Sequence, residues 1–264
     1  MLIAQISDTH IAAPGQRTCG VAPMAENLRR VVRHINGMEP GPDLVILTGD
    51  VTQAASLEET RLAAEVLSAL QMPLHIVPGN HDDRQILSEV FGPDICSMTA
   101  SGECHSVIEG HPLRLIGLDT LHPGHSGGRI SPSALRWLDA RLAEGGNQPT
   151  VIFAHHPPLR LGVPETDEDG FIGAKDLGAL IAARSNIERI LCGHIHLHTN
   201  TRWQGAVVTT APSIGMQLTL QPGVQLPSKF WLSEPSFLLH HWTKDQLLVS
   251  HPMVLSALPG PFEF

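Results

Sequence analysis

Residues 43–50 read DLVILTGD, an apolar run of strand length that ends in a glycine and an aspartate. The length and apolar content predict a buried strand, and the Gly-Asp pair predicts the turn that ends it. The same strand-to-turn unit recurs along the chain. Its other copies are LIAQIS (2–7), LHIVPGNHDD (74–83), PLRLIGLDT (112–120), TVIFAHHPP (150–158), ERILCGHIH (188–196) and AVVTTAPS (206–213).

Helical patterns separate several of these strands, so the sequence predicts an α/β fold. Apolar spacing and capping residues predict helices over 24–38, from the capping box at 56–59 through Leu70, and from Ser131 to the glycines at 145–146. Residues 236–242 and 246–251 predict a hairpin. We expect one domain over 1–264, with an irregular excursion at about 214–235 that forms a cap or an oligomerisation segment. The acidic run at 165–170 is interpreted as a solvated loop.

Composition excludes several classes of function. The net charge of −9 is unfavourable for general nucleic-acid binding, which requires clusters of Lys and Arg. No apolar run reaches the roughly 18 residues of a membrane span, and the first ten residues do not resemble a signal peptide, so we expect a soluble cytoplasmic protein without a membrane partner. The four cysteines form no C-x-x-C pair, which disfavours a cysteine zinc site. Sixteen histidines against no tyrosine favour metal chemistry.

Five of the strands end in polar clusters that carry metal donors. Strand ends that meet at one edge of an α/β sheet bring such residues together. The candidate ligands are Asp8, His10, Asp50, Asn80, His155, His194 and His196. Seven donors exceed one tetrahedral zinc site and suit two divalent ions that share a bridging carboxylate. The mixture of carboxylate, imidazole and amide fits Mn, Fe, Co or Zn.

The order D-x-H, G-D, G-N-H-D, H-H-P-P and G-H-x-H resembles the calcineurin-like metallophosphoesterases over residues 1 to about 200. The quoted motifs look most like the bacterial branch with class III cyclic nucleotide phosphodiesterases and glycerophosphodiesterases. The resemblance implies a four-layer αββα sandwich of two mixed sheets flanked by helices. It also implies one metal on Asp8, His10 and His196, another on Asn80, His155 and His194, and Asp50 as the bridge.

The implied activity is hydrolysis of small phosphodiesters, such as cyclic nucleotides or glycerophosphodiesters, through attack of a hydroxide that bridges the metals. The resemblance gives His81 the role of assisting the leaving group, beside the catalytic residues Asp50 and Asn80. Asp82 or another carboxylate is a candidate to orient His81. We expect His156 to support the ligands and His198 to lie outside the site.

Other functions are also compatible with the sequence. The same metal pair can hydrolyse phosphomonoesters, and a non-catalytic scaffold is a third reading that the intact ligand set disfavours. A protein phosphatase is disfavoured because GDVTQAAS lacks the arginine of that branch. Substrate choice is expected from His122 and His125 and from the excursion, where Met216, Phe230 and Trp231 could stack on a base or simply pack. A homodimer or larger homo-oligomer is compatible with this branch.

Overall fold

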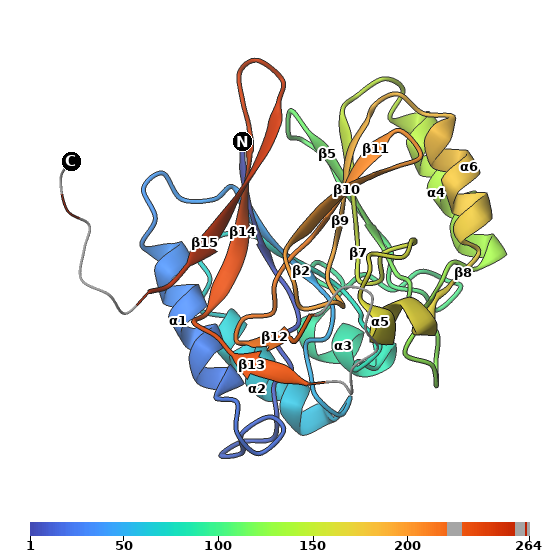
Figure 1. The fold of residues 1–264 in the computed structure, drawn as a ribbon. Helices are drawn as coiled ribbons and strands as arrows, with labels where there is room; N and C mark the ends of the chain where they lie inside the picture. Colours follow the sequence, from blue (N-terminus) through green and yellow to red (C-terminus); the bar gives the residue numbers. More distant parts are fainter. Residues whose placement is uncertain (221–228, 257–261, 263–264) are drawn as a thin grey trace.

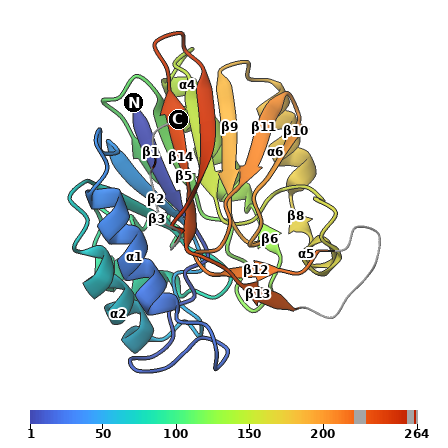
Figure 2. The same cartoon turned by 60° about the vertical axis from the view of Figure 1, so that its left-hand side comes forward.

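The computed structural model describes residues 1–220, 229–256 and 262. Two mixed sheets form the centre (Figure 1, Figure 2). In the first sheet the strand order is β15 (Leu248–Val254), β14 (Ser236–Trp242), β1 (Leu2–Ile6), β2 (Leu44–Thr48) and β3 (Leu74–Val77). In the second sheet it is β10 (Thr199–Trp203), β11 (Ala206–Thr210), β9 (Ile187–Cys192), β7 (Thr150–Ala154), β5 (Arg114–Leu118) and β4 (Ser106–Ile108).

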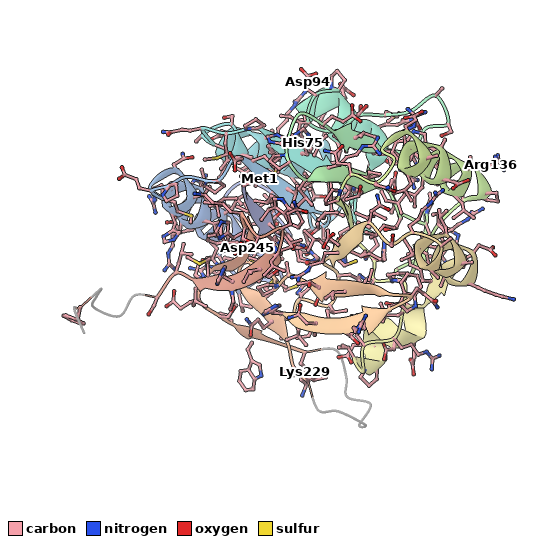
Figure 3. The ribbon with its side chains drawn as sticks, turned by 90° about the horizontal axis from the view of Figure 1, so that it is seen from above. Met1, His75, Asp94, Arg136, Lys229 and Asp245 are labelled. Carbon is pink, nitrogen blue, oxygen red and sulfur yellow. The ribbon has the colours of Figure 1, made fainter. Side chains whose placement is uncertain are left out.

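Helices cover the outer faces of both sheets. They are α1 (Met24–Asn36), α2 (Leu57–Leu67), α3 (Arg84–Phe91), α4 (Pro132–Glu144) and α6 (Ala174–Ala182). The short helix α5 (Pro164–Asp169) has no buried residue and lies at the lower edge in Figure 1. Viewed from above, α1 to α3 lie along one side, and α4, marked by Arg136, and α6 along the other (Figure 3). Two small ribbons complete the fold: β12 (Met216–Leu218) pairs with β13 (Phe230–Leu232), and β6 (Gly128–Arg129) pairs with β8 (Phe171–Ile172).

The DLVILTGD stretch shows why the layers form. Leu44 and Ile46 pack between the two sheets, in a cluster that also holds Phe153 of β7. Val45 and Leu47 point the other way, into the core shared with α1 and α2. Side chains alternate between faces along a strand, so a strand that is apolar at every position must be covered on both sides. The predicted four-layer α/β sandwich is therefore confirmed.

The parallel strands place the site. β1, β2 and β3 run parallel in the first sheet, and β5, β7, β9 and β11 do so in the second. Their carboxyl ends lie at the lower edge in Figure 1, where α5 and the β12–β13 ribbon also lie. Among the described residues, no helix combines the length and apolar character that a membrane crossing needs.

Three sequence predictions change. The prediction of a loop for the acidic run at 165–170 is wrong, because Pro164–Asp169 forms the short helix α5. Helices α3 and α6 were not predicted. Part of the 214–235 excursion is regular, since β12 and β13 pair through Met216 and Leu232; its residues 221–228 lie outside the described part of the chain. The C-terminal hairpin is confirmed as β14 and β15.

Candidate metal centre

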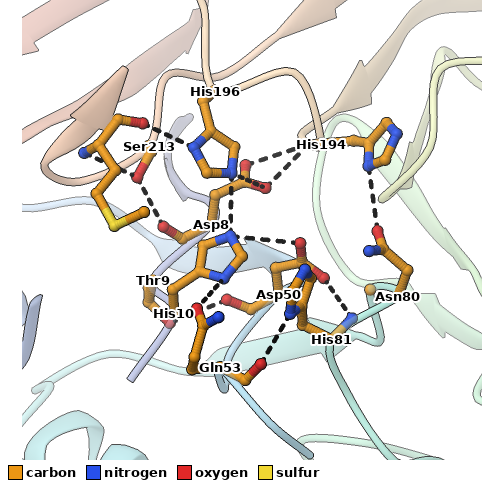
Figure 4. A network of polar contacts seen from close by, with 12 residues as sticks. Asp8, Thr9, His10, Asp50, Gln53, Asn80, His81, His194, His196 and Ser213 are labelled. Carbon is orange, nitrogen blue, oxygen red and sulfur yellow. Dashed lines mark hydrogen bonds and ion pairs between the residues drawn. The ribbon is translucent and has the colours of Figure 1, made fainter. Parts of the chain in front are cut away.

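The predicted ligands all lie just past the ends of strands and come together. Asp8 and His10 follow β1, Asp50 follows β2, and His194 and His196 follow β9. All five have positive φ, between 41° and 71°, a region that L-residues rarely occupy. Backbone hydrogen bonds hold them there: the N–H of His10 donates to the carbonyl of Asp50 at 2.9 Å. The strand ends are thereby turned so that their side chains face one another (Figure 4).

One group of donors consists of Asp8, His10, Asp50 and His196, whose ligand atoms all lie within 4.8 Å of one another. The Nε2 atoms of His10 and His196 are 3.0 Å apart. His10 Nε2 is 3.4 Å from a carboxylate oxygen of Asp50, and His196 Nε2 is 3.5 Å from one of Asp8. The group is almost fully buried. Two carboxylates and two imidazoles around one point form a donor set suited to a divalent transition metal.

The outer nitrogens of these histidines fix the direction of their lone pairs. His196 Nδ1 lies 2.7 Å from the carbonyl of Met216, and His10 Nδ1 lies 3.1 Å from the amide oxygen of Gln53. Carbonyl and amide oxygens accept hydrogen bonds but cannot donate them, so Nδ1 of each histidine carries the proton. Each neutral ring therefore turns the lone pair of its Nε2 atom inward. Burial lowers the pKa of His10 to about 3, which keeps that lone pair free at neutral pH. A cation between the two Nε2 atoms satisfies both.

A second group of donors lies on the other side of Asp50. Asn80 Oδ1 is 3.1 Å from His155 Nε2 and 3.1 Å from His194 Nδ1. His155 donates its Nδ1 proton to the carbonyl of Thr48 at 2.7 Å, so its Nε2 also faces inward. One oxygen of Asp50 is 3.4 Å from His155 Nε2, while the other faces His10. Asp50 therefore stands between the two groups, as a bridging ligand requires.

The charges of the second group favour a cation at the same place. Burial disfavours the imidazolium of His155, but the carboxylates of Asp50 and Asp8 outweigh burial and raise the pKa of His155 to about 9. A proton on Nε2 points at Asp50, where a metal ion would lie. Metal binding requires loss of this proton, so binding is expected to weaken at low pH.

His156 does not offer a free nitrogen to a metal, although it lies beside His155 and His194. Its Nδ1 is 2.9 Å from the hydroxyl of Thr120, and its Nε2 is 3.0 Å from the carbonyl of Ser126. Both ring nitrogens are engaged, so His156 connects the centre to the loop at 120–126. Its support of the metal ligands stays a prediction.

His81 lies at the mouth of the centre, with its ring edge-on to His10 at 4.8 Å between centroids. Its backbone N–H donates to Asp50, and its Nδ1 donates to the backbone carbonyl of Gln53 at 2.8 Å. Asp82, a candidate to orient it, instead accepts hydrogen bonds from the backbone of Val51, Thr52 and Gly79. A backbone carbonyl, not a carboxylate, orients His81.

A cavity of 380 Å³ opens over the centre. It is lined by His10, Cys19, Asp50, Gln53, Asn80, His81, Ser126, Glu165, Thr166, Asp169, His194, His196, Met216 and Leu218. No metal-donor motif marks Gln53, Ser126, Glu165 or Asp169 as site residues, because they lie on loops and on α5. Of the predicted substrate residues, Met216 lines the cavity, whereas His122 and His125 stack on each other at 4.0 Å and Trp231 is 69% exposed. His198 lies outside the cavity and contacts Asn200.

Comparisons with known proteins identify the family. The family model described as calcineurin-like phosphoesterase matches residues 1–198. The chain belongs to the calcineurin-like phosphoesterase family. Among calcineurin-like phosphoesterases, it is 33% identical over 265 residues to the probable glycerophosphodiester phosphodiesterase GpdQ of Arcobacter nitrofigilis, covering 100% of this chain and 97% of that one.

Other relatives agree with this assignment. The 3′,5′-cyclic adenosine monophosphate phosphodiesterase CpdA of Escherichia coli K12 is 28% identical, with 81% of this chain and 76% of that one covered. A dimetal phosphatase from Danio rerio superposes with a TM-score of 0.65 at 16% identity, covering 97% of this chain and 99% of that one. At that identity the last comparison shows the fold alone.

Proposed function

We propose that the chain is a metal-dependent phosphodiesterase that hydrolyses small phosphodiesters at this centre. Asp8, His10 and His196 would hold one divalent ion, and Asn80, His155 and His194 the other, with Asp50 between them. The observation that carries the proposal is the inward direction of the Nε2 atoms of His10, His155 and His196. Each is fixed by the hydrogen bond that Nδ1 of the same ring donates, to Gln53, Thr48 and Met216 respectively. When bound, two such ions supply Lewis acidity toward phosphoryl oxygens and lower the pKa of water.

The chain's own residues supply the remaining steps. His81 borders the cavity and is held through Nδ1 by the Gln53 carbonyl, which leaves Nε2 for the substrate. In its protonated form His81 can donate that proton to the departing alkoxide, a poor leaving group without it. Asn80 contributes a neutral oxygen, so the second ion would retain more positive charge toward the phosphate than it would beside a third carboxylate.

The charge of the cavity favours a diester over a monoester. Its described lining holds no Lys or Arg, and Glu165 and Asp169 add negative charge at its rim. A diester carries one negative charge and a monoester close to two near neutral pH, so the rim repels the monoester more strongly. The names of the GpdQ and CpdA relatives support the same choice. Phosphomonoester hydrolysis remains the second candidate, because the two ions can clamp either substrate.

The first test compares kcat/KM for bis(p-nitrophenyl) phosphate and p-nitrophenyl phosphate with the manganese-loaded protein. We expect a clear preference for the diester. A preference for the monoester would move the assignment to a phosphatase. Two bound ions with no turnover of either ester would favour a scaffold.

We also propose that residues 1–264 form one domain in which the 214–235 excursion acts as a cap or a site of self-association. The β12 strand lines the cavity through Met216 and Leu218. Trp231 and Leu232 on β13 are 69% and 54% exposed, an unusual state for adjacent large apolar side chains. Replacing both with serine should lower the molar mass measured by sedimentation if they join two copies. An unchanged mass would leave only the cap.

A further inference from the structure

The metal centre lies across the gap between the two sheets. The ends of β1, β2 and β3 supply one set of proposed ligands, and the ends of β7 and β9 supply the other. The first set is Asp8, His10, Asp50 and Asn80, and the second is His155, His194 and His196. Across the gap His196 faces Asp8 and His10 (Figure 4). Each ion would take ligands from both sets, so the spacing of the sheets at this edge sets the spacing of the ligands.

The layer between the sheets is apolar over most of its depth and polar next to the centre. On the faces that point into this layer, β1 and its end carry Ile3, Gln5 and Ser7, and β2 carries Leu44, Ile46 and Thr48. Gln5 is 0% exposed. A buried amide is unfavourable unless its hydrogen bonds are made, so the partners of Gln5 decide what this residue contributes.

The amide of Gln5 joins the ends of strands that carry ligands. Its Nε2 donates to the hydroxyl of Thr48 at 3.0 Å and to the carbonyl of Cys192 at 3.0 Å. Thr48 ends β2, two residues before Asp50, and Cys192 ends β9, two residues before His194. Gln5 itself lies on β1, which leads to Asp8. One side chain therefore connects three ligand-bearing strands, two in the first sheet and one in the second.

A network on the other side of Gln5 fixes the direction of its amide. Arg189 of β9 donates to the hydroxyl of Ser250 on β15. A guanidinium cannot accept a hydrogen bond, so Ser250 directs its own proton to Nδ1 of His240, 2.7 Å away. Nε2 of His240 then carries the ring proton and donates to Oε1 of Gln5 at 3.0 Å. The NH2 group of Gln5 is thereby turned toward the strand ends, and all its polar atoms are satisfied.

The two partners of Gln5 Nε2 are linked to the second group of donors. The carbonyl of Thr48 is the acceptor that orients His155, at 2.7 Å. Gly193, which follows Cys192, packs so closely on the first sheet that a Cβ there would overlap Ser7 Oγ. A change in the spacing of the sheets would therefore displace both His155 and the turn that carries His194.

We propose that Gln5 is a positioning residue that holds the two sheets at the spacing required by the ion on Asn80, His155 and His194. The inference rests on the ligand assignment of the proposed function, and Gln5 is not part of the described cavity lining. Loss of a partner that orients a ligand directly weakens metal binding by about 10- to 100-fold. Gln5 acts one contact further out, so we expect a loss at the lower end, about tenfold.

The ion on Asp8, His10 and His196 should be less affected. Asp8 and His10 follow β1, the strand of Gln5 itself, and His196 is held by the carbonyl of Met216. None of these contacts passes through the Gln5 amide. The expected signature is therefore unequal: one site keeps its affinity and the other loses it.

The test measures manganese binding to the metal-free protein in the absence of any ester. Gln5→Met removes both N–H donors and keeps a side chain of similar length. Titration followed by the electron paramagnetic resonance signal of free manganese should give one site of wild-type affinity and one about tenfold weaker. His240→Gln is the matched control. It alters the same network and is expected to lower stability, but it keeps a donor for Gln5 Oε1 and both bonds of Nε2, so both sites should bind as in the wild type.

A second variant tests the same bond from its other end. Thr48→Val removes the hydroxyl that accepts from Gln5 and keeps the shape of the side chain and the backbone carbonyl that holds His155. It should weaken the same manganese site by a smaller factor than Gln5→Met, because the bond to Cys192 remains. If Gln5→Met does not fold, Thr48→Val carries the test.

The outcomes separate this inference from the proposed function. Wild-type affinity at both sites in folded Gln5→Met, or in Thr48→Val if that variant carries the test, would overturn the positioning role. Equal weakening in Gln5→Met and His240→Gln would assign the effect to stability and overturn it as well. Two bound ions without turnover of bis(p-nitrophenyl) phosphate would refute the phosphodiesterase alone, because manganese binding is measured without ester. Fewer than two manganese sites in the wild type would refute the ligand assignment and both proposals with it.

Discussion

Acidification from pH 7 to pH 5 should destabilise the folded chain by about 2 kcal/mol through one buried side chain, His240. This residue of β14 is 0% exposed and lies between the sheets. Its Nδ1 is 2.7 Å from the hydroxyl of Ser250, and its Nε2 is 3.0 Å from the amide oxygen of Gln5. Among the described residues, no carboxylate is a cause of the shift in its pKa. Burial, with the nearby Arg189 cation as a smaller cause, lowers the pKa of His240 from 6.5 to about 3.

The sign follows from proton binding. Below pH 6.5 the unfolded chain takes up a proton at this histidine, and the folded chain does not until about pH 3. Stability from this group is therefore complete above pH 6.5 and is lost as the pH falls toward 3. Between pH 7 and pH 5 the unfolded state gains about 1.4 logarithmic units of proton binding, which is about 1.9 kcal/mol.

The assay is urea unfolding of the metal-loaded wild type and His240→Gln at pH 7 and pH 5. Glutamine retains an amide N–H for Gln5 but cannot titrate. The variant should be less stable at pH 7, by about 1–3 kcal/mol for an imperfectly paired buried group. The difference in unfolding free energy between the variant and the wild type should shrink by about 2 kcal/mol at pH 5. Only in the wild type does the unfolded chain take up a proton at residue 240 over this interval. The metal ligands are identical in both proteins and cancel. An unchanged deficit across this interval would refute the reasoning.

Three further results are expected at the centre. Asn80→Ala should lower the metal content toward one ion per chain and reduce turnover; two ions and normal activity would contradict the ligand assignment. His81→Ala should slow esters with alkyl alcohol leaving groups more than nitrophenyl esters, and equal losses would exclude proton donation to the leaving group. Gly193→Ala would place a methyl carbon 2.0 Å from Ser7 Oγ and 2.8 Å from an oxygen of Asp8, and should cost about 1–3 kcal/mol of stability. Gly37→Ala, with 3.5 Å of room, is the control for thermal unfolding.

The strands and the convergence of their ends could be predicted because a general physical rule governs each. An apolar run such as LVIL must be covered on two faces, and parallel strands bring their carboxyl ends to one edge. Helix α5 could not be predicted, because none of its residues is buried and its acidic sequence has no apolar period. Its position depends on contacts with Gly127 and Gly128, which are distant in sequence.

Within the site, motifs predicted residue types but not all partners. His81 is oriented by a backbone carbonyl at Gln53, and any residue can supply a carbonyl, so no sequence signal marks it. Asp82 follows His81 directly in the sequence, which makes it an obvious candidate partner. Its carboxylate instead accepts hydrogen bonds from three backbone N–H groups. The sequence shows that residue 82 is an aspartate, but not whether its carboxylate accepts from His81 or from backbone N–H groups. That depends on the direction in which the turn points the side chain.

The backbone of the centre shows what this arrangement requires of the fold. Five of the seven proposed ligands have positive φ, and each such non-glycine residue costs of the order of 1 kcal/mol or more. In the H-x-H turn this conformation directs His194 Nδ1 toward Asn80 and His196 Nε2 toward His10, so two histidines separated by one residue serve different groups. A sequence selected for stability alone would place glycine or asparagine at such turns. The cost persists because surrounding hydrogen bonds, such as that from Ser213 Oγ to the carbonyl of Asp8 at 2.8 Å, hold the strained backbone in place. The strain is thus concentrated where metal binding can repay it, as expected when local rules are broken at a functional site.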